Sequence, residues 1–292
     1  MNRLTEAAQS WLVGGHFCRV DGVELFYRIT GKNKQDLPWL VCFHGFPSSS
    51  WDWHSLIPLL KHKYRVLVFD FPGYGLSGKP PERNYSLGRQ LDAADALLAH
   101  LKIREFHLLA HDMGNSVACE LLYRREQGEY PFELKSLTLL NGGIYMDLHQ
   151  PLLTQRLLRT PLIGPLTARF SSWPVFRRQY PRVYAHPEQF DEDHYRSQWA
   201  LMLNNQGRRT LHQIAGYMKE RTRMGDRWTG PLKRLELPFT VIWGKQDSIA
   251  VYAIAQKLCR ENRLIELHTL EDAGHYPQLE VPEQVAARLV PV

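Results

Sequence analysis

Asp112 lies at the centre of the stretch Ala110-His111-Asp112-Met113-Gly114, which has the small-x-Asp-x-small pattern of a nucleophile elbow. Small residues at Ala110 and Gly114 let a strained turn close between a strand and a helix, and the turn raises the central side chain above the sheet. Most hydrolases have serine at this position. An aspartate there predicts a carboxylate nucleophile, which suits attack at a saturated carbon and gives an ester that activated water then hydrolyses.

Two further residues follow predicted strands at positions suited to assist Asp112. Asp247 comes shortly after the strand that ends at Trp243, and His275 follows the last strand. We expect His275 to act as the general base and Asp247 to orient its imidazole and stabilise the charged form. Ser116 lies one helical turn past the elbow, so a serine esterase is the weaker interpretation.

The segment His44-Gly45-Phe46-Pro47 follows the first predicted buried strand, where an oxyanion loop is expected. The backbone N–H groups of Phe46 and Met113 would then point at the same developing negative charge. We assign His44, Trp51 and His111 to the surroundings of the substrate pocket. Core packing is the alternative for Trp51, and holding the elbow is the alternative for His111.

The elements that must position these residues are short apolar runs rich in β-branched and aromatic side chains. Six such runs predict buried strands, and they end at Phe43, Phe69, Ala110, Leu140, Trp243 and Leu270. Alternation of strands with helical patterns predicts an α/β fold with a doubly wound, mostly parallel sheet. Loops at the carboxyl ends of its strands then gather the reactive side chains.

Residues 148–229, called the cap segment below, differ from the rest of the chain. They are rich in Arg, Tyr, Trp and Pro, show several helical patterns and contain no convincing buried strand. We therefore predict a core formed by residues 1–147 and 230–292, with the cap segment inserted between two strands as a helical lid.

The order nucleophile, acid, histidine, together with the oxyanion loop, resembles the α/β-hydrolase fold, in the branch of epoxide hydrolases and haloalkane dehalogenases. The stretches ELLYR, LNGGIY, HQPLL and HYPQLE resemble more closely the mesoderm-specific-transcript group of hydrolase-like proteins. The resemblance runs from about Phe17 to the end of the chain and is looser in the cap segment. It implies an α/β-hydrolase fold with an inserted helical cap.

The leaving group distinguishes the two enzyme classes of that branch. Haloalkane dehalogenases hold the halide with N–H donors, typically a tryptophan directly after the nucleophile, whereas the side chains of Met113 and Phe46 donate nothing. Epoxide hydrolases protonate the leaving alkoxide with cap tyrosines. Tyr217 stands in a segment that resembles the one carrying such a tyrosine, and Tyr180 or Tyr184 is the expected partner.

The sequence therefore predicts an epoxide hydrolase that converts an epoxide and water to a vicinal diol. Two alternatives stay open, a haloalkane dehalogenase-like hydrolase with unusual halide donors and a non-enzymatic binding protein on the same fold. The presence of Asp112, Asp247 and His275 together argues against the second, because proteins that have lost activity commonly lose the nucleophile or the histidine.

Composition limits the partners of this 292-residue chain, whose formal charge is +6. The cap segment holds 13 Lys and Arg against 6 Asp and Glu, so the remaining residues are nearly neutral, at 23 against 24. The excess belongs to the cap, and we expect no nucleic-acid partner, although peripheral contact of the basic cap with a membrane surface stays open. We expect a small apolar or amphipathic organic substrate, no cofactor, no metal, no membrane-spanning segment and a cytoplasmic location.

Overall fold

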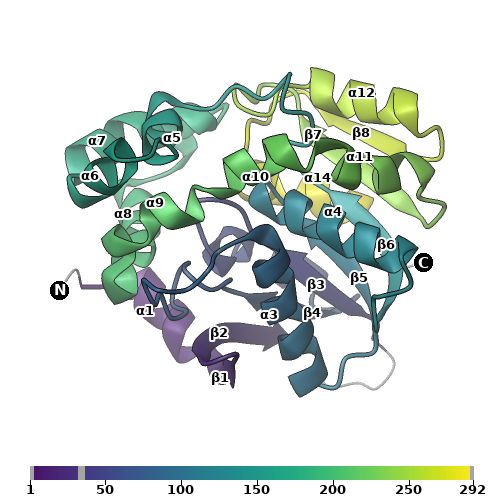
Figure 1. The fold of residues 1–292 in the computed structure, drawn as a ribbon, viewed down its shortest axis with the longest axis horizontal. Helices are drawn as coiled ribbons and strands as arrows, with labels where there is room; N and C mark the ends of the chain where they lie inside the picture. The colour runs from purple at the N-terminus through teal and green to yellow at the C-terminus, as the bar shows by residue number, and fades with distance from the viewer. Residues whose placement is uncertain (1–2, 32–36, 290–292) are drawn as a thin grey trace.

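The computed structural model describes residues 3–31 and 37–289, and within them one sheet holds every named strand (Figure 1). Its eight strands run in the order β1-β2-β4-β3-β5-β6-β7-β8. The strands from β4 to β8 are parallel, which confirms the predicted mostly parallel sheet. The predicted runs correspond to β3 Trp39–Phe43, β4 Arg65–Phe69, β5 Glu105–Ala110, β6 Glu133–Leu139, β7 Phe239–Gly244 and β8 Glu266–Leu270.

An antiparallel hairpin that the sequence analysis did not predict forms one edge of the sheet. It consists of β1 His16–Val20 and β2 Val23–Thr30, and β2 pairs antiparallel with β4. Asp21 and Gly22 turn the chain between the strands, and both have positive φ values, of 48° and 75°. Asp-Gly between apolar alternations is a strong hairpin signal, so the sequence did carry the information.

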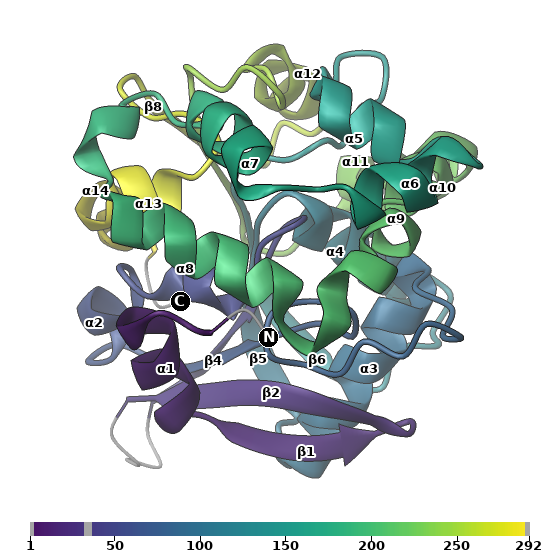
Figure 2. The same ribbon diagram turned by 90° about the vertical axis from the view of Figure 1, so that its left-hand side faces the viewer.

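Helices cover both faces of the sheet, as a doubly wound fold requires (Figures 1 and 2). Successive residues of β3 point to opposite faces of the sheet, and both faces are covered. Val41 packs in one core with Leu91 and Val117, whereas Leu40 packs in a second core with Leu60. β3 is therefore apolar on both faces, which is typical of buried parallel strands. The core helices are α1 Glu6–Val13, α2 Ile57–Leu60, α3 Leu87–His100, α4 Met113–Glu126, α12 Ala253–Glu261, α13 Pro277–Glu280 and α14 Pro282–Arg288.

Between β6 and β7 the chain is helical and contributes no strand to the sheet of the described residues. Its helices are α5 Leu153–Leu158, α6 Ile163–Arg169, α7 Trp173–Gln179, η2 Tyr180–Val183, η3 Pro187–Gln189, α8 Glu192–Leu203, η4 Asn204–Arg209, α9 Leu211–Ile214, α10 Tyr217–Arg223 and α11 Gly225–Arg234. The predicted end of the cap segment at residue 229 falls within α11, which packs against α4.

Figures 1 and 2 place α5, α6 and α7 at the end of the molecule opposite the β1–β2 hairpin. No helix within residues 3–31 and 37–289 is long and apolar enough to cross a membrane.

Candidate active site

The turn around Asp112 has the strained geometry expected of a nucleophile elbow. Asp112 has φ 48° and ψ −109°, and α4 begins at the next residue. Its backbone N–H donates to the carbonyl oxygen of Asn141 at 2.9 Å, which ties the elbow to the end of β6. A Cβ at Gly114 would collide with the backbone of Phe43, so the close passage of α4 over β3 requires glycine.

His275 lies between the two aspartates predicted to accompany it. Its Nδ1 is 2.7 Å from Oδ2 of Asp247, and its Nε2 is 3.9 Å from Oδ2 of Asp112. All three side chains are almost fully buried. The structure therefore brings together three residues that are spread over more than half of the chain, in an arrangement suited to a nucleophile, a base and an orienting acid.

Hydrogen bonds fix the orientation of the Asp247 carboxylate. Its Oδ1 accepts from the backbone N–H groups of Ile249 at 2.7 Å and Ala250 at 3.0 Å, and its Oδ2 accepts from Nδ2 of Asn141 at 2.9 Å. Burial raises the pKa of Asp247, but the positive charge of His275 and these hydrogen bonds outweigh burial and lower it overall. Asp247 is thus held ionised beside the imidazole.

Burial and charge act in opposite directions on the other two groups. Burial lowers the pKa of His275, but the charge and hydrogen bond of Asp247, followed by the charge of Asp112, raise it to about 9. Burial raises the pKa of Asp112, and the positive charges of Arg221 and His275 oppose that rise. The neighbouring charges therefore favour a protonated His275 and oppose protonation of Asp112.

The two predicted oxyanion donors flank Asp112. Phe46 follows the loop after β3, and Met113 is the first residue of α4. Neither backbone N–H donates to an acceptor among the residues described by the structure. Both groups therefore lack an internal acceptor, as the predicted role in an oxyanion hole requires.

Arg221 is a member of this site that the sequence analysis did not identify. It extends from α10 of the cap segment and is only 2% exposed. Its Nη2 donates to the backbone carbonyl oxygen of Asp112 at 2.7 Å and lies 3.9 Å from Oδ1 of the same residue, while its Nε donates to Oγ of Ser116. The sequence could have indicated Arg221, because it lies four residues after Tyr217 and this spacing places both side chains on one helix face.

The three candidate tyrosines occupy different positions. The hydroxyl of Tyr217 donates to Oδ1 of Asp112 at 3.4 Å, and burial together with the charge of Asp112 raises its pKa, so it stays protonated. The Tyr180 hydroxyl is buried near Tyr184 and Tyr276, and it makes no well-formed hydrogen bond among the described residues. The Tyr184 hydroxyl contacts Nε2 of His194 at 3.0 Å.

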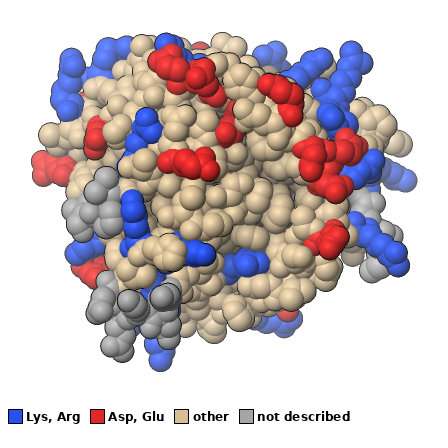
Figure 3. Space-filling model, turned by 180° about the vertical axis from the view of Figure 1, so that it is seen from behind, with Lys and Arg blue, Asp and Glu red and all other residues tan. Residues whose placement is uncertain are grey.

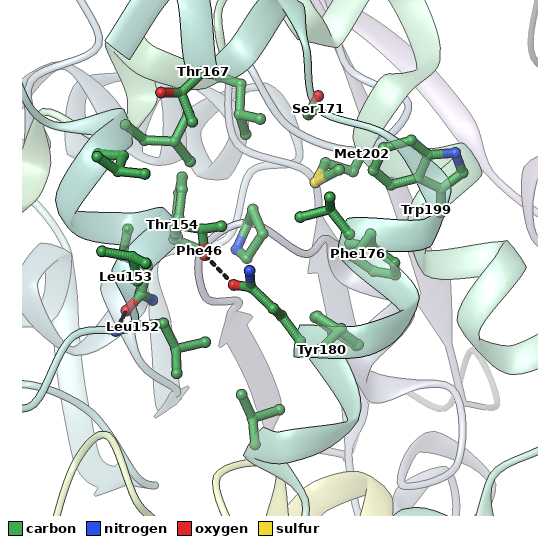
Figure 4. A pocket seen from close by; sticks show the side chains of 18 of the residues that line it. Phe46, Leu152, Leu153, Thr154, Thr167, Ser171, Phe176, Tyr180, Trp199 and Met202 are labelled. Atoms are coloured by element: carbon green, nitrogen blue, oxygen red, sulfur yellow. Dashed lines mark hydrogen bonds between the residues drawn. The ribbon is translucent and has the colours of Figure 1, made fainter. Parts of the chain in front are cut away.

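A cavity of about 330 Å³ leads from the cap helices to His275 (Figure 4). Figure 4 shows Leu152 and Leu153 on one side, and Phe176 and Trp199 on the other. The lining is mainly apolar and includes Phe46, Tyr180 and Tyr276 but neither Tyr184 nor Tyr217. Tyr180 is thus the candidate tyrosine that borders the space open to a substrate.

The lining of this cavity does not include His44, Trp51 or His111, so their predicted place in the substrate pocket stays a prediction. Asp112 also lies outside this lining, behind His275. The Nε2 atom of His44 accepts from the backbone N–H of Phe71 at 3.0 Å, so this ring ties two loops together. Trp51 stacks on His54 at 4.1 Å between ring centroids.

His111 holds the loop that carries His275. Its Nε2 donates to the carbonyl oxygen of His275 at 2.7 Å, and burial lowers its pKa well below the usual value, so the ring is neutral. The alternatives named from the sequence, packing for Trp51 and a structural role for His111, fit these contacts.

Asp52 is a second buried charge that the sequence analysis did not single out. It lies in the 3-10 helix η1 Ser50–Trp53 and is fully buried. Gln198 of α8 donates to its Oδ1 at 3.0 Å, and Ser48 donates to its Oδ2. Burial raises the pKa of Asp52 to about 7. The hydrogen bond from Gln198 to Asp52 joins the cap segment to the core. The position of Asp52 between Trp51 and Trp53 was the signal for it in the sequence.

Comparison with protein families places these residues in a known context. The model of the alpha/beta hydrolase family matches residues 40–288, which is most of the chain. The mesoderm-specific transcript protein of Mus musculus is 34% identical over 287 residues, covering 96% of this chain and 86% of the mouse protein. This similarity agrees with the resemblance seen in the sequence.

Solved structures with the same architecture include enzymes of two kinds. Haloalkane dehalogenase DbeA from Bradyrhizobium elkani USDA94 has a TM-score of 0.78 at 25% identity, covering 93% of this chain and 94% of the dehalogenase. Epoxide hydrolase CorEH has a TM-score of 0.75 at 19% identity, covering 94% of this chain and 95% of that enzyme, and this likeness concerns the fold alone.

Proposed function

Because the chain belongs to the alpha/beta hydrolase family, we propose that it is a hydrolase with an aspartate nucleophile that converts an epoxide to a vicinal diol. The observation that carries this proposal is the arrangement around Asp112. Its carboxylate faces Nε2 of His275 on one side and receives the hydroxyl of Tyr217 on the other. A carboxylate, a base and a neutral O–H donor are the groups that this reaction requires.

In the first step, a carboxylate oxygen of Asp112 attacks an epoxide carbon, and the bond between that carbon and the ring oxygen breaks. The electron pair goes to the ring oxygen, which takes a proton from a tyrosine hydroxyl. Tyr217 suits this role because it is protonated and already contacts Asp112. Tyr180 suits the role of second donor because its hydroxyl makes no well-formed hydrogen bond among the described residues and it borders the cavity.

In the second step, water attacks the ester carbonyl carbon of Asp112 while His275 removes its proton. The negative charge that develops on the carbonyl oxygen is stabilised by the backbone N–H groups of Phe46 and Met113. Collapse of this intermediate restores the Asp112 carboxylate and expels the diol alkoxide, which takes the proton held by His275. The second proton of the attacking water returns to the tyrosinate formed in the first step, so the base and the tyrosine are both regenerated. One carboxylate oxygen of Asp112 leaves in the product and is replaced by an oxygen of water.

The pKa of His275 changes between the two steps in the direction that the reaction needs. In the free enzyme the charge of Asp112 is among the causes that raise the pKa of His275 to about 9. Esterification makes Asp112 neutral and removes that contribution, so the imidazole becomes easier to deprotonate. The first step thereby prepares the base for the second.

The ester intermediate provides the test. His275→Gln retains ester formation but lacks the base for hydrolysis, so incubation with styrene oxide should add the mass of the epoxide to the peptide containing Asp112. The wild-type enzyme in H₂¹⁸O should take up ¹⁸O into that peptide after one turnover. Asp112→Ala is the control, and full activity of this variant would overturn the mechanism.

A haloalkane dehalogenase is the second candidate, favoured by the structural similarity to DbeA. The same His275→Gln variant distinguishes the two, because 1-bromobutane would add a butyl group to Asp112 and release bromide. Release of bromide without any reaction of styrene oxide or a fatty epoxide would replace the epoxide proposal by this one. Absence of any adduct from both classes would favour a non-enzymatic binding protein.

A further inference from the structure

Large apolar side chains are exposed mainly on one short stretch of the cap segment. Six side chains within residues 153–175 fall into this class, and Leu162, Phe170 and Leu153 are 87%, 73% and 66% exposed. They lie on or beside α5, α6 and α7, at the end of the molecule opposite the β1–β2 hairpin (Figures 1 and 2). We call this set the cap face: Leu153, Leu162, Ile163, Leu166, Phe170 and Val175.

The stretch of sequence that carries the cap face contains basic residues and no acidic ones. Residues 148–187 contain six arginines and no Asp, Glu or Lys. Each of the three helices repeats one spacing, with an arginine three positions after an exposed apolar residue: Leu153 and Arg156, Leu166 and Arg169, Val175 and Arg178. Residues three apart share a helix face, so apolar and cationic groups are presented together.

Most of these arginines are free to meet an external partner. Arg177 forms an ion pair with Glu192. Arg156, Arg169 and Arg178 are exposed and have no acidic partner within 4.0 Å in the part of the chain that the structure describes. Elsewhere the charges are mixed, and on the face in Figure 3 basic and acidic side chains are interspersed.

The candidate substrate cavity opens within this surface. Leu153, Phe170 and Val175 belong to the cap face and also line the cavity, which extends inward to His275. A protein bound over the cap face would cover the entrance. A fluid lipid surface would instead leave the entrance in contact with an apolar phase from which a substrate can enter.

We propose that the cap face docks onto an anionic membrane surface and admits substrates that are dissolved in the lipid. Exposed leucine and phenylalanine enter the boundary between headgroups and acyl chains, while the arginines contact lipid phosphates and their aliphatic parts lie along the apolar layer. Docking is independent of the chemistry at Asp112. The choice of an apolar epoxide as the substrate rests on the proposed function.

Vesicle binding tests docking separately from catalysis. The full chain is sedimented with vesicles of phosphatidylcholine containing 30% phosphatidylglycerol, and with vesicles of phosphatidylcholine alone. We expect binding to the anionic vesicles that weakens as salt is raised, because the arginines interact with a screened surface potential. Absence of binding to anionic vesicles at low salt would overturn the proposal and leave the surface to a protein partner.

Two pairs of variants separate the apolar and the cationic contributions. Leu162→Ser with Leu166→Ser changes cap-face residues outside the cavity lining, and Leu264→Ser is the control because that leucine is 64% exposed but lies between α12 and β8. We expect the double variant to lower the partition coefficient at least tenfold and the control to leave it unchanged. Equal loss in both would overturn the proposal.

Arg169→Gln with Arg178→Gln is compared with Arg104→Gln and Arg125→Gln, which remove the same charge from exposed positions outside the cap. A lipid phosphate contact predicts about a fivefold loss per cap arginine. A similar loss in the comparison pair would show attraction by net charge alone, which contradicts a defined docking face.

A turnover assay links docking to substrate delivery. The Leu162→Ser and Leu166→Ser variant should hydrolyse a short water-soluble epoxide at the wild-type rate and a vesicle-embedded fatty epoxide at least tenfold more slowly. If no epoxide is hydrolysed but anionic vesicles are still bound, the proposed function fails and the docking surface stands.

Discussion

The Nη2 atom of Arg221 donates a hydrogen bond of 2.7 Å to the backbone carbonyl oxygen of Asp112, across a sequence separation of 109 residues. The same guanidinium lies 3.9 Å from Oδ1 of Asp112 and is almost fully buried. The cap segment thus supplies both a positive charge to the proposed nucleophile and a restraint on its strained turn. Ester formation should depend on this cap residue as well as on the triad.

Loss of the Arg221 charge is expected to make Asp112 harder to ionise. The guanidinium opposes the rise in the pKa of Asp112 that burial causes. Arg221→Gln should therefore move the acid limb of ester formation to higher pH. Single-turnover rates measured by mass spectrometry from pH 4 to 9 check this shift.

Arg221→Lys and Arg227→Gln separate this effect from a loss of cap attachment. Arg227 of α11 also joins the cap segment to α4, through Glu120 at 2.9 Å, but lies away from Asp112. We expect the acid limb of ester formation to lie at the wild-type pH in Arg227→Gln. In Arg221→Lys, which keeps the positive charge, it should lie close to the wild-type pH. An unchanged acid limb in Arg221→Gln would reduce Arg221 to a structural role.

The three cap tyrosines should differ in their effect on ring opening. Tyr217→Phe and Tyr180→Phe remove the proposed donors, and ester formation should slow by about 10²–10⁴-fold for a residue that donates the proton. Tyr184→Phe is the matched control, because its hydroxyl contacts Nε2 of His194, whereas the hydroxyl of Tyr217 donates to Asp112. A larger effect of Tyr184→Phe than of Tyr180→Phe would reverse the assignment of the second donor.

Ester hydrolysis should rise with pH because His275 acts only when it is neutral. The charge of Asp112 contributes to the pKa of about 9 in the free enzyme, and that charge is absent in the ester. The midpoint of the hydrolysis step should therefore lie below 9. Decay of the isolated ester, followed by mass spectrometry from pH 5 to 10, measures this midpoint, and a rate independent of pH would contradict the role of His275 as base.

Asp52→Asn is expected to stabilise the protein at alkaline pH. Because burial raises the pKa of Asp52 to about 7, the folded state keeps a proton that the unfolded state releases above about pH 4. Stability is consequently lost as pH rises from about 4 to 7, on the order of 4 kcal/mol for this group. The asparagine amide can donate to the unpartnered Oε1 of Gln198, so the substitution fits the site.

Urea unfolding of both proteins at pH 5 and pH 8 tests this expectation. The difference in the free energy of unfolding between variant and wild type should be more favourable to the variant at pH 8. Asp247→Asn should instead destabilise the protein at both pH values, because the pKa of Asp247 is lowered and its ionised form stabilises the fold at pH 5 as well as at pH 8. An Asp52→Asn effect that is equal at both pH values would exclude ionisation of Asp52 as its cause.

Local patterns were sufficient for the core of the fold. Apolar runs bounded by turn residues predicted the strands from β3 to β8, and their ends placed Asp112, Asp247 and His275 at one edge of the sheet. The hairpin of β1 and β2 was missed although Asp21-Gly22 signals it. The surroundings of His44 and Trp51 could not be predicted, because His44 contacts Phe71 and Trp51 packs on Trp11, and both partners are distant in the sequence.

By itself, the sequence determined which residue types follow which strands, because strand ends in a parallel sheet gather at one edge whatever the details of packing. The choice of Tyr180 over Tyr184, the burial of Arg221 beside Asp112 and the link from Asp52 to Gln198 required the tertiary structure. These relationships depend on how the cap segment packs on the core. Such packing is set by side-chain volumes and long-range contacts, which no local spacing records.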